Sequence, residues 1–312
     1  MNQISQTALP QPPLINSGAF MGAIYMICAG LSFALVNLAT QYLTMSLGVT
    51  SPVVAFGQYF AALLFSLPWL LKVGIRAART NATGKHLLRV IFAVLGVQAW
   101  VAGLAHVPIW QGIALIMTSP FFVTLGAHLI LKEKIGIHRL AATILGFVGG
   151  MIILAPWSDS FSFYALWPVV AAIFWAGTSL LTKTLTGNEA PEAVTLYLLL
   201  FMTPFNGLLA VGSGFAMPGM DAIAIIGLSG FFVLLSQWLI ARAYSSADAA
   251  YVQPFDHVKL PFNVAAGWIA FGFAPVGQFW LGALLIVAAS LYILHRETRL
   301  YRGPTGAAAA AI

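Results

Sequence analysis

The sequence predicts an all-α polytopic membrane protein with ten transmembrane helices, arranged as two inverted-topology repeats of five helices. Three observations predict this class. Of the 312 residues, 60% are hydrophobic and only 7% are charged, whereas a soluble domain carries roughly a quarter charged residues. Apolar stretches of about 20 residues, the length that crosses a bilayer, recur along the chain. The basic residues are concentrated in alternate loops between these stretches.

The expected spans lie between a polar N-terminal tail at 1–18 and a C-terminal tail at 296–312. They divide into a first repeat at 19–156 and a second at 163–295. Stretches this long and this uniformly apolar fit helices better than the short alternating strands of a membrane barrel. The ten spans are expected at 19–40, 53–71, 87–106, 112–131, 139–156, 163–182, 192–212, 220–243, 249–271 and 275–295.

The basic residues predict the orientation of these spans. Loops rich in lysine and arginine stay in the cytoplasm, so we expect both termini on the cytoplasmic side of a bacterial-type inner (plasma) membrane. This interpretation makes the basic residues topology determinants with solvated side chains and gives no indication of nucleic-acid binding. Every basic residue except Lys259 follows or ends an even-numbered span: Lys72, Arg76, Arg79, Lys85, Arg89, Lys132, Lys134, Arg139, Lys183, Arg242, Arg296, Arg299 and Arg302.

The two halves of the chain resemble each other. Residues 33–44 align without gaps to residues 175–186, with five of the twelve positions identical. A weaker similarity relates 119–122 to 253–256. Because each half has an odd number of spans, the halves must be inverted relative to each other. Inverted repeats are typical of secondary transporters, in which the solute site lies near the middle of the membrane between the repeats.

The expected ninth span contains three ionisable side chains, Asp256, His257 and Lys259, between Pro254 and Pro261. A charge at membrane depth costs about 2.5–3.5 kcal/mol on insertion scales. Proline interrupts helical hydrogen bonding, and irregular backbone in a membrane is tolerated only where it faces protein or water. We therefore expect this span to face an interior cavity. The sequence leaves two roles open: a structural ion pair, or coordination of a solute or proton.

Further polar and aromatic side chains occur in the middle of several spans. Each alone could be a contact between helices, but together they predict a hydrated cavity. We also expect the prolines at 120, 254 and 261 to be structural or gating residues. The candidate substrate-binding residues are Asn37, Gln58, Gln98, Trp100, Trp238, Gln253, Asp256, His257 and Lys259, and the prolines are Pro120, Pro254 and Pro261.

Two long stretches carry the resemblance to a known family. Residues 104–154 have a turn between Ala105 and Pro108, a proline within the fourth span, and Glu133 at the end of that span. Residues 241–297 contain Pro-Phe-Asp, followed by Gly-Trp and Phe-Gly pairs.

Over about residues 19–297 the chain resembles the ten-helix EamA-type members of the drug/metabolite transporter superfamily. It departs from their pattern in two places. Phe273 stands where the family usually repeats the glutamate of the first half, and Gln58 stands where the second span often has an arginine.

The resemblance implies a secondary transporter that moves a small metabolite by alternating access. Solutes of such relatives include amino acids, S-adenosylmethionine and riboflavin. The aromatic and amide side chains favour a planar, hydrogen-bonding solute such as riboflavin. A phosphorylated solute would need more interior cations than Lys259. An exporter of amino acids or other metabolites remains the alternative, and proton coupling through His257 stays open.

Two other function classes are weighed against transport. One is a membrane receptor without turnover. The other is an intramembrane enzyme, which the chain does not favour, because Ser119 and His128 lie nine residues apart on one expected helix. Neither a cofactor nor a metal is expected, since no His/Cys/Asp cluster has ligand spacing and no phosphate-binding loop precedes a Lys-Ser/Thr pair. The expected partners are a small solute and the lipid bilayer.

Overall fold

The structure is a computed structural model. It describes residues 17–73, 80–119, 121–122, 137–155, 157–158, 161–246, 255, 259–275 and 277–301. Regular secondary structure in these residues is entirely helical. Among them, six helices are long and apolar enough to cross a membrane. The chain is therefore an all-helical, polytopic membrane protein.

The helices begin and end close to the expected spans. The expected spans 112–131 and 249–271 lie partly outside the described residues. The helices are α1 (Ser17–Gln41) with a π-helical extension η1 (Tyr42–Ser46), α2 (Ser51–Val73), α3 (Thr83–Leu104), α4 (Ile109–Ile116), α6 (Ile137–Leu154), the short η3 (Phe163–Ala165), α7 (Leu166–Thr186), α8 (Pro191–Gly212), α9 (Met220–Ser246), α11 (Lys259–Phe271) and α12 (Gly277–Tyr301).

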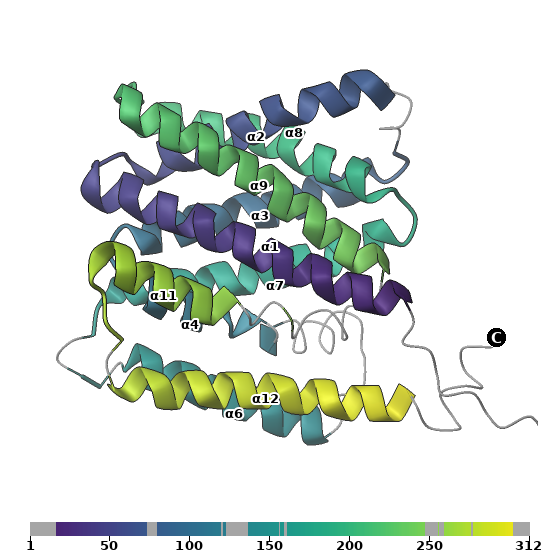
Figure 1. Cartoon of the computed structure of the whole chain (residues 1–312), viewed down its shortest axis with the longest axis vertical. Helices are drawn as coiled ribbons and strands as arrows, with labels where there is room; N and C mark the ends of the chain where they lie inside the picture. The colour runs from purple at the N-terminus through teal and green to yellow at the C-terminus, as the bar shows by residue number, and fades with distance from the viewer. Residues whose placement is uncertain are drawn as a thin grey trace, which may run out of the picture.

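Helices from the two halves of the chain are interleaved rather than separated. Helix α1 packs along α9, α3 packs along α7, and α2 contacts both α8 and α9. Helices α6 and α12 pack against each other and form a layer at one side, with α4 and α11 between this pair and the rest of the bundle (Figure 1). A site enclosed by α1, α3, α7 and α9 is therefore built from both halves.

The α6–α12 contact is made by two glycines. A Cβ atom added to Gly149 would lie 2.7 Å from the carbonyl oxygen of Gly282, and one added to Gly282 would lie 2.6 Å from the carbonyl oxygen of Gly149. Real Cβ atoms do not approach backbone this closely. The two backbones can touch only because both residues lack a side chain.

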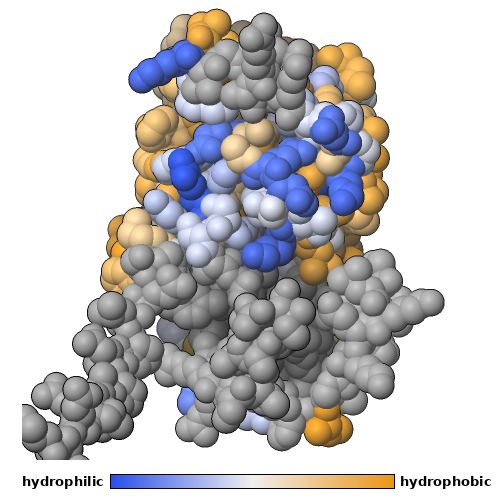
Figure 2. Space-filling model, turned by 90° about the vertical axis from the view of Figure 1, so that its right-hand side faces the viewer, coloured by the Kyte–Doolittle hydropathy of each residue, from blue (hydrophilic) through white to orange (hydrophobic). Residues whose placement is uncertain are grey.

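The surface separates into apolar flanks and a hydrophilic end. Large apolar side chains on the flanks are strongly exposed, including Leu71 at 83% and Ile269 at 84%, as expected where lipid covers a helix. Figure 2 shows one end of the bundle, where hydrophilic residues gather between hydrophobic margins. At one end, the loop before α8 contacts the start of α3. The first turn of α8 contacts the last turns of α9.

Candidate functional site

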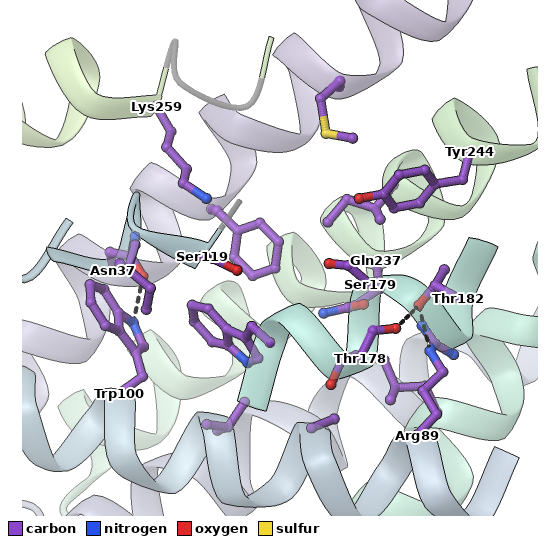
Figure 3. Close-up of a pocket in the computed structure, with 18 of the residues that line it drawn as sticks. Asn37, Arg89, Trp100, Ser119, Thr178, Ser179, Thr182, Gln237, Tyr244 and Lys259 are labelled. Carbon is purple, nitrogen blue, oxygen red and sulfur yellow. Dashed lines mark hydrogen bonds between the residues drawn. The ribbon is translucent and has the colours of Figure 1, made fainter. Parts of the chain in front are cut away.

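A cavity lies inside the bundle, between helices of both halves (Figure 3). The centres of water molecules could occupy a volume of about 120 Å³ inside it. That is room for several waters, because one water needs roughly 10–15 Å³ on this measure. The lining residues come from α1, α2, α3, α4, α7, α8, α9 and α11.

One side of the cavity, the aromatic end, is formed by Trp100, Trp175 and Asn37. The indole rings of Trp100 on α3 and Trp175 on α7 have centroids 5.8 Å apart and are tilted by 47°. Trp175 fits against α3 because Gly96 has no side chain; a Cβ there would lie 2.6 Å from the indole Cδ1. Trp100 is 4% exposed, so most of its ring is covered by neighbouring side chains.

A chain of buried hydrogen bonds fixes the aromatic end. Trp100 Nε1 donates to Asn37 Oδ1 at 3.0 Å, and Asn37 Nδ2 donates to Asn263 Oδ1 at 3.1 Å. Asn263 Nδ2 in turn donates to the backbone carbonyl of Lys259 at 2.7 Å. The chain joins α3, α1 and α11. Because each amide uses both its oxygen and its nitrogen, the orientation of the Trp100 ring is determined by α1 and α11.

The opposite side of the cavity, the polar end, is formed by Arg89, Thr178, Ser179, Thr182 and Gln237 (Figure 3). Arg89 lies on α3 and is 2% exposed. Its Nε donates to Thr182 Oγ1 at 2.7 Å, and its Nη1 donates to the carbonyl of Val194 at 3.0 Å. The guanidinium therefore connects α3 of the first half to α7 and α8 of the second.

The structure brings three predicted site residues, Asn37, Trp100 and Lys259, to the cavity. Three other predicted residues are absent from its described lining and have partners elsewhere. Gln58 donates to Thr40 at 2.9 Å, Gln98 donates to Asn206 at 2.8 Å, and Trp238 Nε1 donates to Glu192 at 3.0 Å. In this structure their polar groups satisfy contacts between helices, and a direct role for them in solute binding stays a prediction.

The remaining candidates have different outcomes. Pro261 lies exposed in the first turn of α11. A proline in a first turn leaves the hydrogen bonds of the helix intact, so this residue does not interrupt α11. The other candidates lie outside the described residues: Pro120, Gln253, Pro254, Asp256 and His257.

The assignment of Arg89 as a solvated topology determinant is wrong. The expected span began at residue 87, whereas α3 begins at Thr83, which carries Arg89 one turn deeper into the bundle. The described lining residues consequently include two cationic side chains, Arg89 and Lys259. Lys259 is therefore not the only interior cation.

Sequence reasoning also missed the cavity-facing stripe of α7. Trp175, Thr178, Ser179 and Thr182 all line the cavity and follow the spacing i, i+3, i+4, i+7, which places side chains on one helix face. A stripe of hydroxyl side chains on an otherwise apolar span is a signal that could have identified them. Gln237 and Tyr244 on α9 complete the lining near Arg89.

Beyond Arg89, a buried contact at the start of α3 connects the two halves. Glu189, in the loop between α7 and α8, accepts a hydrogen bond from Thr80 and lies 2.7 Å from His86 Nε2. The His86 ring is fully buried and packs on Tyr197, with centroids 4.5 Å apart. His86 lies one turn from Arg89 on α3, so this contact joins the two halves near the polar end of the cavity.

An ion pair between Arg242 and Glu192 lies wholly within the second half. Arg242 Nη2 on α9 is 2.6 Å from Glu192 Oε1 on α8, and the Arg242 guanidinium lies 5.3 Å from the ring centre of Trp238. Among the described residues, no group of three His, Cys, Asp or Glu side chains could hold a metal ion.

Comparison with known proteins agrees with this architecture. The EamA-like transporter family matches residues 20–155. A riboflavin transporter of Rhizobium johnstonii is 53% identical, covering 97% of this chain and 100% of the relative. A riboflavin transporter of Vibrio cholerae is 49% identical, covering 92% and 97%. An S-adenosylmethionine uptake transporter of Rickettsia bellii is 26% identical, covering 79% and 84%.

The fold is also similar to that of a solved crystal structure. The TM-score is 0.62 at 15% sequence identity, covering 91% of this chain and 98% of the other. The names of the relatives confirm the prediction of a transporter rather than an enzyme. With a near full-length relative at 53% identity and a family match over residues 20–155, the chain belongs to the EamA-like transporter family of the drug/metabolite transporter superfamily, and it is an integral membrane transporter.

Proposed function

We propose that this protein is a secondary transporter that moves riboflavin across a bacterial-type inner membrane by alternating access. The observation that carries the proposal is the pair of riboflavin transporters that match almost the whole chain at 53% and 49% identity. The S-adenosylmethionine transporter is only 26% identical. Riboflavin has a planar ring system with hydrogen-bonding edges, the solute type that the sequence favours.

The cavity supports this solute. Trp100 and Trp175 offer flat faces for a planar ring, and aromatic pairs of this kind contribute about 0.5–1.5 kcal/mol beyond their buried area. Asn37 and Lys259 place polar groups beside them. We propose Asn37, Trp100 and Lys259 as the predicted residues that contact the solute. The roles of Gln253, Asp256 and His257, including proton coupling, stay predictions.

Helix packing supports the ten-helix architecture of two inverted repeats at 19–156 and 163–295. Under that arrangement α7, α8, α9 and α12 are the counterparts of α1, α2, α3 and α6. The contact of α1 with α9 is then repeated by the contact of α7 with α3. Counterparts also meet each other, as α2 meets α8 and α6 meets α12. The basic loops support cytoplasmic termini.

Flux measurements test the proposal. Purified protein in liposomes should take up labelled riboflavin with saturation, and unlabelled riboflavin should compete better than S-adenosylmethionine or amino acids. Imposing a proton gradient of either sign tests coupling. Binding of riboflavin without flux would indicate a receptor instead. Flux of an amino acid that riboflavin does not inhibit would indicate the alternative exporter.

A further inference from the structure

We propose that the polar end of the cavity binds the ribityl chain of the solute, while the aromatic end holds its isoalloxazine ring. This assignment rests on riboflavin being the solute. It gives Thr178 and Ser179 a direct role in selecting a polyhydroxyl chain. It also determines which end of the solute faces which end of the cavity. Hydrogen-bonding capacity that the polar end leaves unused supports this role.

The geometry of α3 separates the two ends by the length of an extended solute. Arg89 and Trp100 lie on the same helix, three turns apart, which corresponds to about 16 Å along its axis. Along α7, Trp175 at the aromatic end lies about one turn from Thr178 and about two turns from Thr182. A solute with its ring against the indole faces would extend its substituent along this face of α7.

The hydroxyl hydrogens of the two threonines at the polar end are already in use. Thr178 Oγ1 donates to the carbonyl of Phe174 at 3.1 Å. Thr182 Oγ1 donates to the carbonyl of Thr178 at 2.7 Å and accepts from Arg89 Nε. The Thr178 oxygen, which lines the cavity, therefore presents acceptor lone pairs to a guest. Such an oxygen requires a ligand that donates.

Arg89 provides the complementary donors. A guanidinium carries five N–H groups, and its hydrogen bonds to Thr182 and Val194 use two of them. The polar end thus offers donors from Arg89 beside an acceptor from Thr178, with the Gln237 amide able to do both. Hydroxyl groups also donate and accept, so a polyhydroxyl chain matches both sets of groups.

A phosphate matches this end less well. Its oxygens only accept at neutral pH, so they would face the Thr178 oxygen unfavourably. Arg89 is the one cation among the described residues that line the polar end, because Lys259 lies on the other side of the cavity (Figure 3). A doubly charged group would keep an uncompensated charge in a buried site. The polar end therefore selects a neutral chain.

The test combines truncation of the solute with truncation of the side chain. Binding of riboflavin and of lumiflavin, which has a methyl group in place of the ribityl chain, is measured by fluorescence on the purified full-length protein. Thr178→Val removes the hydroxyl at nearly constant volume. Thr184→Val is the matched control, because Thr184 lies on the same helix, makes the same backbone hydrogen bond to Leu180 at 2.9 Å and is exposed.

We expect Thr178→Val to weaken riboflavin binding about tenfold, as for one unsatisfied buried hydrogen bond, and to change lumiflavin binding less than about twofold. Ser179→Ala should act in the same direction, and it replaces Thr178→Val if that variant does not fold. Thr184→Val should change neither ligand. Flavin mononucleotide should compete less well than riboflavin.

Three results would overturn the assignment: equal losses for lumiflavin and riboflavin in Thr178→Val, no loss in either Thr178→Val or Ser179→Ala, or tighter binding of flavin mononucleotide than of riboflavin by the unmodified protein. If the unmodified protein binds and transports no riboflavin at all, the proposed function fails, and the assignment fails with it. Riboflavin flux with an unselective polar end would overturn the assignment alone.

Discussion

Trp100 depends on Asn37 for its position. Its indole nitrogen donates to the Asn37 oxygen, and the Asn37 nitrogen is itself engaged by Asn263. Removing the Asn37 amide would leave a buried indole N–H without a partner, which costs about 1–3 kcal/mol. Asn37 was identified from the sequence as a polar residue within a span, but its partners on α3 and α11 depend on tertiary packing.

We expect Asn37→Ala to weaken riboflavin binding about tenfold, because the aromatic wall loses its fixed orientation. The measurement is a fluorescence titration of the purified protein, repeated in a Trp100→Phe background. There the ring has no N–H to orient, so Asn37→Ala should have a smaller effect. Equal effects in both backgrounds would show that Asn37 acts independently of Trp100.

Arg89 is a buried charged residue, and its burial is tolerated because its guanidinium has hydrogen-bond partners. A sequence places a basic residue near the end of a span, but it does not show whether the first helical turn lies in the headgroups or inside the bundle. Because α3 has an extra turn before residue 87, Arg89 lies inside the bundle. The positive-inside rule describes loops, and Arg89 satisfies hydrogen bonds inside the protein instead.

Replacing Arg89 by methionine should lower the melting temperature strongly, because Thr182 and the Val194 carbonyl lose their partner in a buried site. The expected loss is about 1–3 kcal/mol, as when a buried neutral polar group is left without its hydrogen-bond partner. Lys85→Met, one turn earlier at the exposed start of α3, is the control and should be nearly neutral. Similar melting temperatures for the two variants would contradict the buried role of Arg89.

At the scale of whole elements, hydropathy and length predicted where the described helices lie. These quantities depend on single segments, so the chain itself contains them. Which helices pack together depends on surfaces that meet only in the folded state. The sequence therefore does not show that Gly149 of α6 packs against Gly282 of α12.

Gly149→Ala should destabilise the protein, because the added Cβ would lie 2.7 Å from the Gly282 carbonyl oxygen. Overpacking of this kind costs roughly 1–3 kcal/mol, which thermal unfolding in detergent would detect. Gly227→Ala is the matched control within α9, since nothing lies within 4 Å of its added Cβ. It should be neutral or slightly stabilising, because alanine favours helix. Equal melting temperatures would argue against the close contact.

At the scale of the molecule, two polar contacts have different consequences for alternating access. The His86–Glu189 contact joins the first half to the second, whereas Glu192 and Arg242 both belong to the second half. If the halves rock against each other, only the first contact must break and reform in each cycle. Its position beside the polar end of the cavity makes it a closure on that side.

We expect Glu189→Ala to favour conformations open at this end. If the contact stabilises the closed state by about 1 kcal/mol, its loss would raise the ratio of open to closed molecules about fivefold. The readout is the maleimide labelling rate of Ser179→Cys in a Cys28→Ala background, which has no other cysteine. Glu192→Ala, which breaks only the contact within the second half, should leave the rate unchanged. If both variants label at the same rate, the His86–Glu189 contact does not close the cavity.

The reciprocal arrangement of Gly149 and Gly282 has a consequence for the evolution of this family. Each glycine blocks a side chain at the other position, because each carbonyl occupies the space where the other Cβ would be. A change at one position cannot be accommodated by a further change at the other, since neither can become smaller. Homologues that retain this helix crossing should therefore have lost neither glycine, and those with a larger residue at either site should show the two helices moved apart.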